Sequence, residues 1–284
     1  MSGPPEPGTL AWVFRPQWAG GWALTRWLWV FAAVLCLGPR AWGIGDVYGA
    51  EDMVFTSFFP LDLASRFPLD ARGAWGLWAL GLTGIGCVAW GGRLFHVGIL
   101  VWAVGNWGLL GQEALNCKAY DRLLTWVALA LLMSPAWERG LTAKWRSPLA
   151  RLVLVNIYCA AYGSTGILKL IYEPTWWTGE VLAYHLLHPW FGGKLLGVYL
   201  SDQLWLTAFM GWWTVIFEAV FPFLVWFKRL NPFLLALGFS FHVGLLFLMD
   251  VGPFLFVAVS AYPVLLHPEL GRTAWERFAA WRVR

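Results

Sequence analysis

Residues 204–249 have the sequence LWLTAFMGWWTVIFEAVFPFLVWFKRLNPFLLALGFSFHVGLLFLM. They form two apolar runs, 204–227 and 232–249, which are separated by a short connection that contains Lys228 and Arg229. A run of about 17–25 mainly apolar residues is long enough to cross the ~30 Å hydrocarbon core of a bilayer as a helix. This stretch therefore predicts two consecutive membrane-spanning helices joined by a short basic connection.

The composition of the whole chain agrees with this interpretation. Of the 284 residues, 59% are hydrophobic and only 13% are charged, which is about half the charged share of a soluble domain. The chain also contains 23 Trp and 31 Gly; Trp favours membrane interfaces, and Gly is more frequent in transmembrane helices than in soluble ones. The composition excludes a water-soluble globular protein.

Two further classes of function find no support in the sequence. The net charge is +4, but the basic residues are scattered through short connections and form no run interleaved with aromatic residues, as a nucleic-acid interface would require. The four cysteines contain no C-x-x-C pair: Cys36, Cys87, Cys117 and Cys159. We expect neither a disulfide framework nor a zinc site.

We expect an all-α fold, a polytopic bundle of about eight transmembrane helices with short interfacial helices on the outer face. The candidate spans lie near residues 21–38, 73–90, 94–111, 122–137, 151–170, 204–227, 232–249 and 251–267. No A-x-A-like cleavage signal follows the first span, so we interpret it as a retained helix. Residues 1–16 are predicted to be a disordered tail, 17–268 one transmembrane domain, and 269–284 a cytoplasmic tail.

The orientation follows from the basic residues between the spans, because Lys and Arg are retained on the cytoplasmic side. With the N-terminus inside, twelve basic residues fall on the cytoplasmic side and seven on the outer side. This asymmetry predicts that both termini are cytoplasmic. It also places the two long connections, 39–72 and 171–203, on the outer face, with a helix over 180–188 that Pro189 ends.

Ionisable residues inside spans are costly and need a reason. Arg26 is near the start of its helix, so we expect it to snorkel to the cytoplasmic surface. Glu218 and His242 lie about 14 and 15 Å from the same end of two consecutive helices, and we expect them to pair. That pair would either lock the helical hairpin or take part in catalysis or proton handling.

Lys169 lies near the outer end of the fifth predicted helix, and Tyr162, Gly166 and Lys169 recur at helical spacing. One face of this helix would therefore offer a phenol, a gap and an amine. A lysine kept from water can act as a base or nucleophile, whereas a lysine this near the interface can also simply snorkel.

The outer connection also contains His185 and His188, three residues apart. This spacing allows the two imidazoles to share a face of a helix and, in principle, to bind a metal. The sequence arranges no third ligand nearby, so we expect no metal site.

Several motifs, in order, resemble the HTTM family, the horizontally transferred transmembrane domain shared by vitamin-K-dependent γ-carboxylases and many bacterial relatives. The resemblance covers most of residues 15–268. Its motifs are NCKAYD at 116–121 followed by Ser134-Pro135, GILKL at 166–170 with Trp177 and Gly179 beyond it, FEAVFP at 217–222, and FHVG at 241–244.

The resemblance implies that Lys169 is the base, which in the carboxylases acts with reduced vitamin K and oxygen. It also implies matching positions for Tyr184 and His188 at the mouth of a cavity, and for His242 and Glu218 within it. With Tyr162 and Trp177, Tyr184 and His188 would bind substrate or cofactor. The cofactor would be a reduced quinone such as vitamin K hydroquinone or menaquinol.

Two departures argue against the carboxylation of proteins. The carboxylases have a histidine shortly after the fourth helix that assists the base, whereas residues 133–137 are MSPAW. They also have a large lumenal part after the membrane domain, whereas this chain ends at Arg284.

Two functional interpretations follow. The first is a membrane enzyme in a bacterial inner membrane that uses a quinol and oxygen to modify a lipid-like or small apolar molecule, with a separate outer-face substrate or redox protein as its partner. The second is a non-enzymatic membrane protein that helps another protein to mature, be exported or bind.

Overall fold

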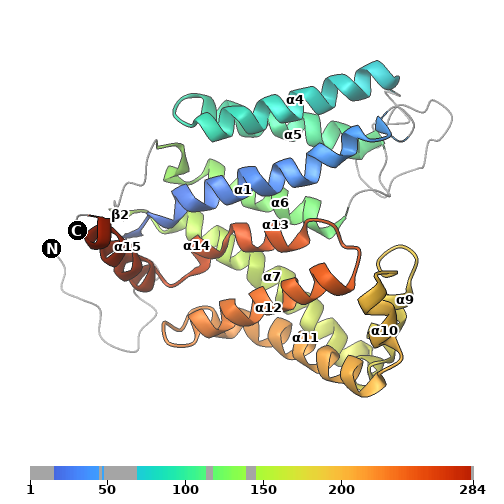
Figure 1. The fold of residues 1–284 in the computed structure, drawn as a ribbon. Helices are drawn as coiled ribbons and strands as arrows, with labels where there is room; N and C mark the ends of the chain where they lie inside the picture. Colours follow the sequence, from blue (N-terminus) through green and yellow to red (C-terminus); the bar gives the residue numbers. More distant parts are fainter. Residues whose placement is uncertain (1–15, 45–46, 48–68, 113–117, 139–144, 283–284) are drawn as a thin grey trace. The chain divides into compact units, whose positions relative to one another are not determined.

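The computed structural model describes residues 16–44, 47, 69–112, 118–138 and 145–282, and these residues are mostly helical (Figure 1). They form two compact units. Unit 1 comprises residues 1–21, 143–255 and 262–284, and unit 2 comprises residues 22–142 and 256–261. Each unit is described by itself.

Six helices of the described chain are long and apolar enough to cross a membrane. They are Gly21–Ala41, which combines α1 (Gly21–Leu37) with the 3-10 helix η2 (Gly38–Ala41), then α4 (Ala71–Trp90), α5 (Leu94–Gln112), α7 (Leu149–Tyr172), α11 (Leu204–Leu224) and α12 (Asn231–Leu248). A seventh span is formed if the bent pair Phe254–Leu265 and Pro268–Arg277 counts as one. The protein is therefore an integral membrane protein with an all-α, polytopic fold, as the sequence predicts.

Two of the eight expected spans take a different form. The span expected at 122–137 corresponds to α6 (Ala119–Leu132), whose 14 residues extend only about 21 Å. The helix gives way to the 3-10 helix η4 (Pro135–Trp137), where the Ser134 hydroxyl accepts a hydrogen bond from the Ala136 amide. The Ser134-Pro135 pair thus ends the regular α-helix of this segment, and the path continues through η4 to Trp137.

The other exception is the span expected at 251–267. It is divided into α13 (Phe254–Ser260) and α14 (Tyr262–Leu265), and the path then turns by 89° into α15 (Pro268–Arg282). Pro263 has no amide hydrogen to continue the ladder of a helix. In unit 1, the Arg151 Nε donates to the Val264 carbonyl at 3.0 Å, and the Asn231 amide donates to the Leu265 carbonyl at 3.1 Å. These two side chains satisfy carbonyls that the end of α14 leaves unpaired.

In unit 2, α4 and α5 form a close antiparallel hairpin (Figure 1). A Cβ atom at Gly84 would lie 2.3 Å from the Trp102 amide nitrogen. Small residues at such crossings let helix backbones approach closely, as is common in membranes. Glycine at this position is therefore needed for the hairpin to close.

Unit 2 also buries two arginines in hydrogen bonds. Arg26 is only 4% exposed and donates from Nη1 to the Ala136 carbonyl at 2.9 Å and to the Glu138 carbonyl at 3.3 Å. The prediction that Arg26 snorkels is therefore wrong, because the open carbonyls around η4 provide it with partners inside the protein. Arg40 is likewise buried, and it pairs with Asp121 and with the side-chain oxygen of Asn106.

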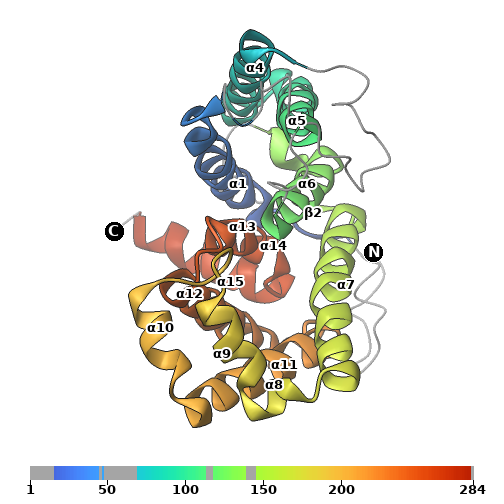
Figure 2. The ribbon, with the colours of Figure 1, turned by 90° about the vertical axis from the view of Figure 1, so that its right-hand side faces the viewer.

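Unit 1 contains the remaining elements: a short antiparallel pair, β1 (Gln17–Trp18) with β2 (Trp145–Arg146), the long helices α7, α11 and α12, and three short helices. The short ones are α8 (Thr175–Thr178), α9 (Glu180–Leu187) and α10 (Leu195–Ser201). All three contact α11 (Figure 2). The helix expected at 180–188 is α9.

Candidate functional site

Helix α7 directs one face towards α11 in unit 1, and this face carries the three residues singled out by their spacing. A Cβ atom at Gly166 would lie 2.4 Å from the Ala219 amide nitrogen of α11. The rings of Tyr162 and Phe221 are 4.8 Å apart. Because Gly166 has no side chain, α11 lies close enough for the side chain of Lys169, one turn further along, to reach it.

Lys169 and Glu218 form an ion pair with two contacts. The Lys169 Nζ donates to Glu218 Oε1 at 2.9 Å and to Oε2 at 2.7 Å. The side chains are 21% and 7% exposed, respectively. Both charges are thus neutralised inside spanning helices, where an isolated charge would be expensive.

Trp176 covers this pair. The Lys169 Nζ lies 4.6 Å from the centroid of the Trp176 ring, a distance at which a cation is attracted to an aromatic face. The ring is held in place because its Nε1 donates to Glu173 Oε2 at 2.9 Å. The amine therefore lies between a carboxylate and an indole that limits access of water.

A second buried pair lies two turns along α7. The Tyr162 hydroxyl and His242 Nε2 are 2.7 Å apart, and His242 is fully buried. Phe254 packs edge-on against the imidazole, with ring centroids 4.9 Å apart. His242 Nδ1 has no hydrogen-bond partner among the described residues.

The predicted pairing of Glu218 with His242 is wrong. Glu218 binds Lys169, and His242 binds Tyr162. Both replacement partners come from α7, which packs against α11. A buried carboxylate is stabilised more by an ammonium than by a neutral imidazole, so Lys169 is the stronger partner for Glu218.

The residues expected at the mouth of the site do not join these pairs. Tyr184 is largely exposed and packs against the ring of His188 at 5.5 Å, while His188 Nδ1 accepts a hydrogen bond from the Trp190 amide. Trp177 packs against Trp212, with ring centroids 4.2 Å apart. Within the part of the chain that the structure describes, none of them contacts Lys169.

Trp176 covers Lys169, whereas Trp177, the residue predicted to bind substrate or cofactor, packs against Trp212. A short helix places these two adjacent side chains on different faces. The signal that could have identified Trp176 is Glu173, three residues earlier in the chain, at the spacing of one helical turn.

His185 lies on α9 near Trp176, with ring centroids 6.2 Å apart. Burial lowers the pKa of His185, and the neighbouring His188 and Lys169 lower it further, whereas Glu173 opposes the shift. Neutral imidazole is therefore the favoured form. Among the described residues, no group of three or more His, Cys, Asp or Glu side chains could hold a metal ion.

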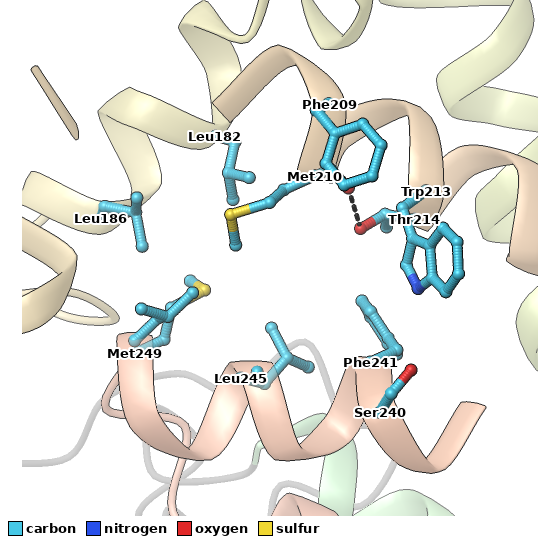
Figure 3. A pocket seen from close by; sticks show the side chains of 12 residues that line it. Leu182, Leu186, Phe209, Met210, Trp213, Thr214, Ser240, Phe241, Leu245 and Met249 are labelled. Carbon is cyan, nitrogen blue, oxygen red and sulfur yellow. Dashed lines mark hydrogen bonds between the residues drawn. The ribbon is translucent and has the colours of Figure 1, made fainter. Parts of the chain in front are cut away.

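A cavity of about 270 Å³ lies between α9, α11 and α12 (Figure 3). Its walls are mostly apolar side chains. The two hydroxyls that line it each donate to a carbonyl of their own helix: Thr214 to Met210 and Ser240 to Leu237. The cavity shares a hydrophobic cluster with Trp176, through residues such as Leu182 and Met249. Lys169, Glu218, Tyr162 and His242 do not line it.

Comparison of the chain with models of protein families, with curated proteins and with solved structures finds no match. The class of protein is defined by the helices: an integral membrane protein with an all-α polytopic bundle.

Proposed function

We propose that this protein is a membrane enzyme of the HTTM type, in which Lys169 removes a proton from a lipid-like or small apolar substrate. The observation that carries the proposal is the buried contact between Lys169 Nζ and the Glu218 carboxylate, 2.7 Å long and covered by Trp176. The motifs that resemble the γ-carboxylase membrane domain add support, since Lys169 matches the position of the base in that family.

The pair suits proton transfer for a physical reason. Burial penalises two charges more than two neutral groups, so a proton can pass from Nζ to a carboxylate oxygen over a short hydrogen bond. The N–H bond breaks, an O–H bond forms, and a neutral amine faces a carboxylic acid. The amine can then accept a proton from the substrate, and the ammonium that forms is stabilised by the aromatic ring of Trp176.

The cavity of Figure 3 does not bring a quinol to the base, because Lys169, Glu218, Tyr162 and His242 do not line it. We therefore derive no step through a quinol.

We further propose that the enzyme lies in a bacterial inner membrane with both termini in the cytoplasm. The support is the excess of basic residues in the connections that this orientation makes cytoplasmic. The site near the end of α7 would then face outward, towards a separate substrate or redox protein.

Lys169→Arg tests the base. Arginine keeps the positive charge but cannot supply a neutral amine, so the variant should fold and insert but lose turnover. The protein is reconstituted into vesicles with a lipid extract and apolar metabolites, and products are sought by mass spectrometry. Lys169→Ala should also be inactive and partly rescued by small added amines.

The matched control is Lys228→Arg, because Lys228 also pairs with a carboxylate, that of Glu269, but at an exposed position. It should retain activity. Full turnover by Lys169→Arg would reject the catalytic role and favour the non-enzymatic interpretation, a membrane partner in the maturation, export or binding of another protein.

A further inference from the structure

The cavity of Figure 3 lies where α9, α11 and α12 meet. A second cavity, of about 440 Å³, lies further along α11 and α12 and is lined by Leu230 and Leu237 among others. Ser240 lines both cavities, so they are neighbours. Along α12, the residues that line the two cavities run from Leu230 to Met249, a length of about 28 Å, close to the ~30 Å of the hydrocarbon core.

The first cavity lies next to Gly244 of α12, a glycine that no other residue packs against closely. A Cβ atom at Gly244 would meet no atom within 4 Å, whereas a Cβ atom at Gly238 would lie 2.7 Å from the Phe217 ring. The two helices therefore touch at Gly238 and leave space at Gly244, which lines the first cavity. An open gap at this position lacks the close packing expected inside a protein.

The first cavity runs from an exposed edge to a buried floor. At its edge on α11, Phe209 and Trp213 are 61% and 41% exposed. At its floor, Leu248 and Met249 are only 7% and 9% exposed. Since α11 and α12 are spanning helices, the medium around them is lipid hydrocarbon.

We propose that this cavity binds an acyl chain of a bilayer phospholipid. Water is a poor occupant because it needs two to four polar partners, and nearly all of the side chains that line the cavity are apolar. A helix of another protein is about 10–12 Å across with its side chains, so even a short piece of it would not fit inside a cavity of about 270 Å³. A narrow apolar chain fits the apolar walls of the cavity, and its site stands independently of the base proposed for Lys169.

Photolabelling tests the site directly. The full-length protein is reconstituted into phosphatidylcholine vesicles that contain a small fraction of phosphatidylcholine with a diazirine in the middle of one acyl chain. After illumination and digestion, labelled residues are identified by mass spectrometry. Phe247, which is 62% exposed on the same helix, reports ordinary contact with surrounding lipid, and Leu248 and Met249 report entry into the cavity. We expect label on the two floor residues as well as on Phe247.

Gly244→Phe should fill the cavity, because its side chain enters open space. Label on Leu248 and Met249 should fall about tenfold, equivalent to about 1.4 kcal/mol of binding, while label on Phe247 stays unchanged. The matched control is Gly86→Phe, the same change on α4 at an exposed glycine that also meets no atom within 4 Å. It should change neither signal.

The wild-type protein alone can overturn the proposal: label on Phe247 without label on Leu248 and Met249 would show that no chain enters. Equal labelling of the floor in a folded Gly244→Phe protein would overturn it as well. If that variant does not fold, Gly244→Leu gives the same comparison with a smaller side chain, and the wild-type result decides in any case.

Discussion

At the scale of single residues, the polar pairs of unit 1 depend on one another. Lys169 and Glu218 neutralise each other within spanning helices, so neither would be tolerated alone at low cost. Removal of one partner from a buried ion pair leaves an uncompensated charge, whereas replacement of both partners by neutral groups avoids that penalty.

We predict that Lys169→Met lowers the free energy of unfolding by about 3 kcal/mol, because Glu218 then remains buried without its cation. The double variant Lys169→Met/Glu218→Gln should recover most of this loss. Glu218→Gln alone should be milder than Glu218→Leu, since the amide oxygen can still accept a hydrogen bond from Lys169. Denaturant titration of the four variants in detergent micelles gives the coupling energy. Additive losses in the double variant would contradict the pairing.

The pH dependence of stability should contain a contribution from His185. Its pKa is lowered in the folded protein, chiefly by burial, so the unfolded chain binds more protons below the ordinary value of about 6.5. The stabilisation of the folded protein by the neutral, buried imidazole of His185 is therefore complete above the ordinary pKa and is lost as the pH falls through the lowered pKa. The loss of Tm between pH 7 and pH 5 should be smaller in His185→Gln than in wild type. An identical loss in both proteins would exclude this role for His185.

At the scale of elements, close contact between α7 and α11 creates the site. Gly163 and Gly166 admit Pro222 and the backbone of Ala219, and this approach brings Lys169 within reach of Glu218. The contact of α11 with α12 is less close, because the apolar cavity lies between these two helices. Helix α11 therefore packs closely on its polar side, against α7, and loosely on its apolar side, towards α12.

Gly166→Ala should separate α7 from α11, because its new Cβ would lie 2.4 Å from a backbone nitrogen. We expect a loss of about 1–3 kcal/mol in the free energy of unfolding. Gly244→Ala is the matched control, since its Cβ meets open space, and it should change stability by no more than about 0.5 kcal/mol. Both are measured by denaturant titration. Equal effects of the two variants would show that the close approach is not required.

At the scale of the whole molecule, consecutive spans must alternate in direction. Helices α11 and α12 each have the length and hydropathy of a span, so the connection between them lies across the membrane from the residues that precede α11. The positive-inside rule predicts that this connection is cytoplasmic, because it contains Lys228 and Arg229.

Because the sequence predicts that the segment of α6 and η4 also crosses the membrane, reporter fusions at residues 60, 142, 190 and 230 should read outside, inside, outside and inside. Residues 60 and 142 fall outside the described part of the chain. A cytoplasmic signal at 190 would remove the argument that the site faces outward. Equal signals at 190 and 230 would mean that α11 does not cross.

The amino-acid sequence alone is enough to predict that the chain lies in a membrane and where most of its long helices run. The small number of charged residues and the long apolar runs exclude a water-soluble protein. The spacing of Tyr162, Gly166 and Lys169 identifies a shared face of α7, since side chains three or four residues apart lie on the same side of a helix. The sequence also marked Glu218 and His242 as residues that need partners.

The identity of those partners depends on how the helices pack. Depth along two helices suggested that Glu218 meets His242, but α7 packs against α11 and supplies Lys169 and Tyr162 instead. Arg26 finds its carbonyl partner 110 residues away. Periodicity records the face and depth of a residue on its own helix, whereas the identity of its neighbour depends on how separate helices pack side by side.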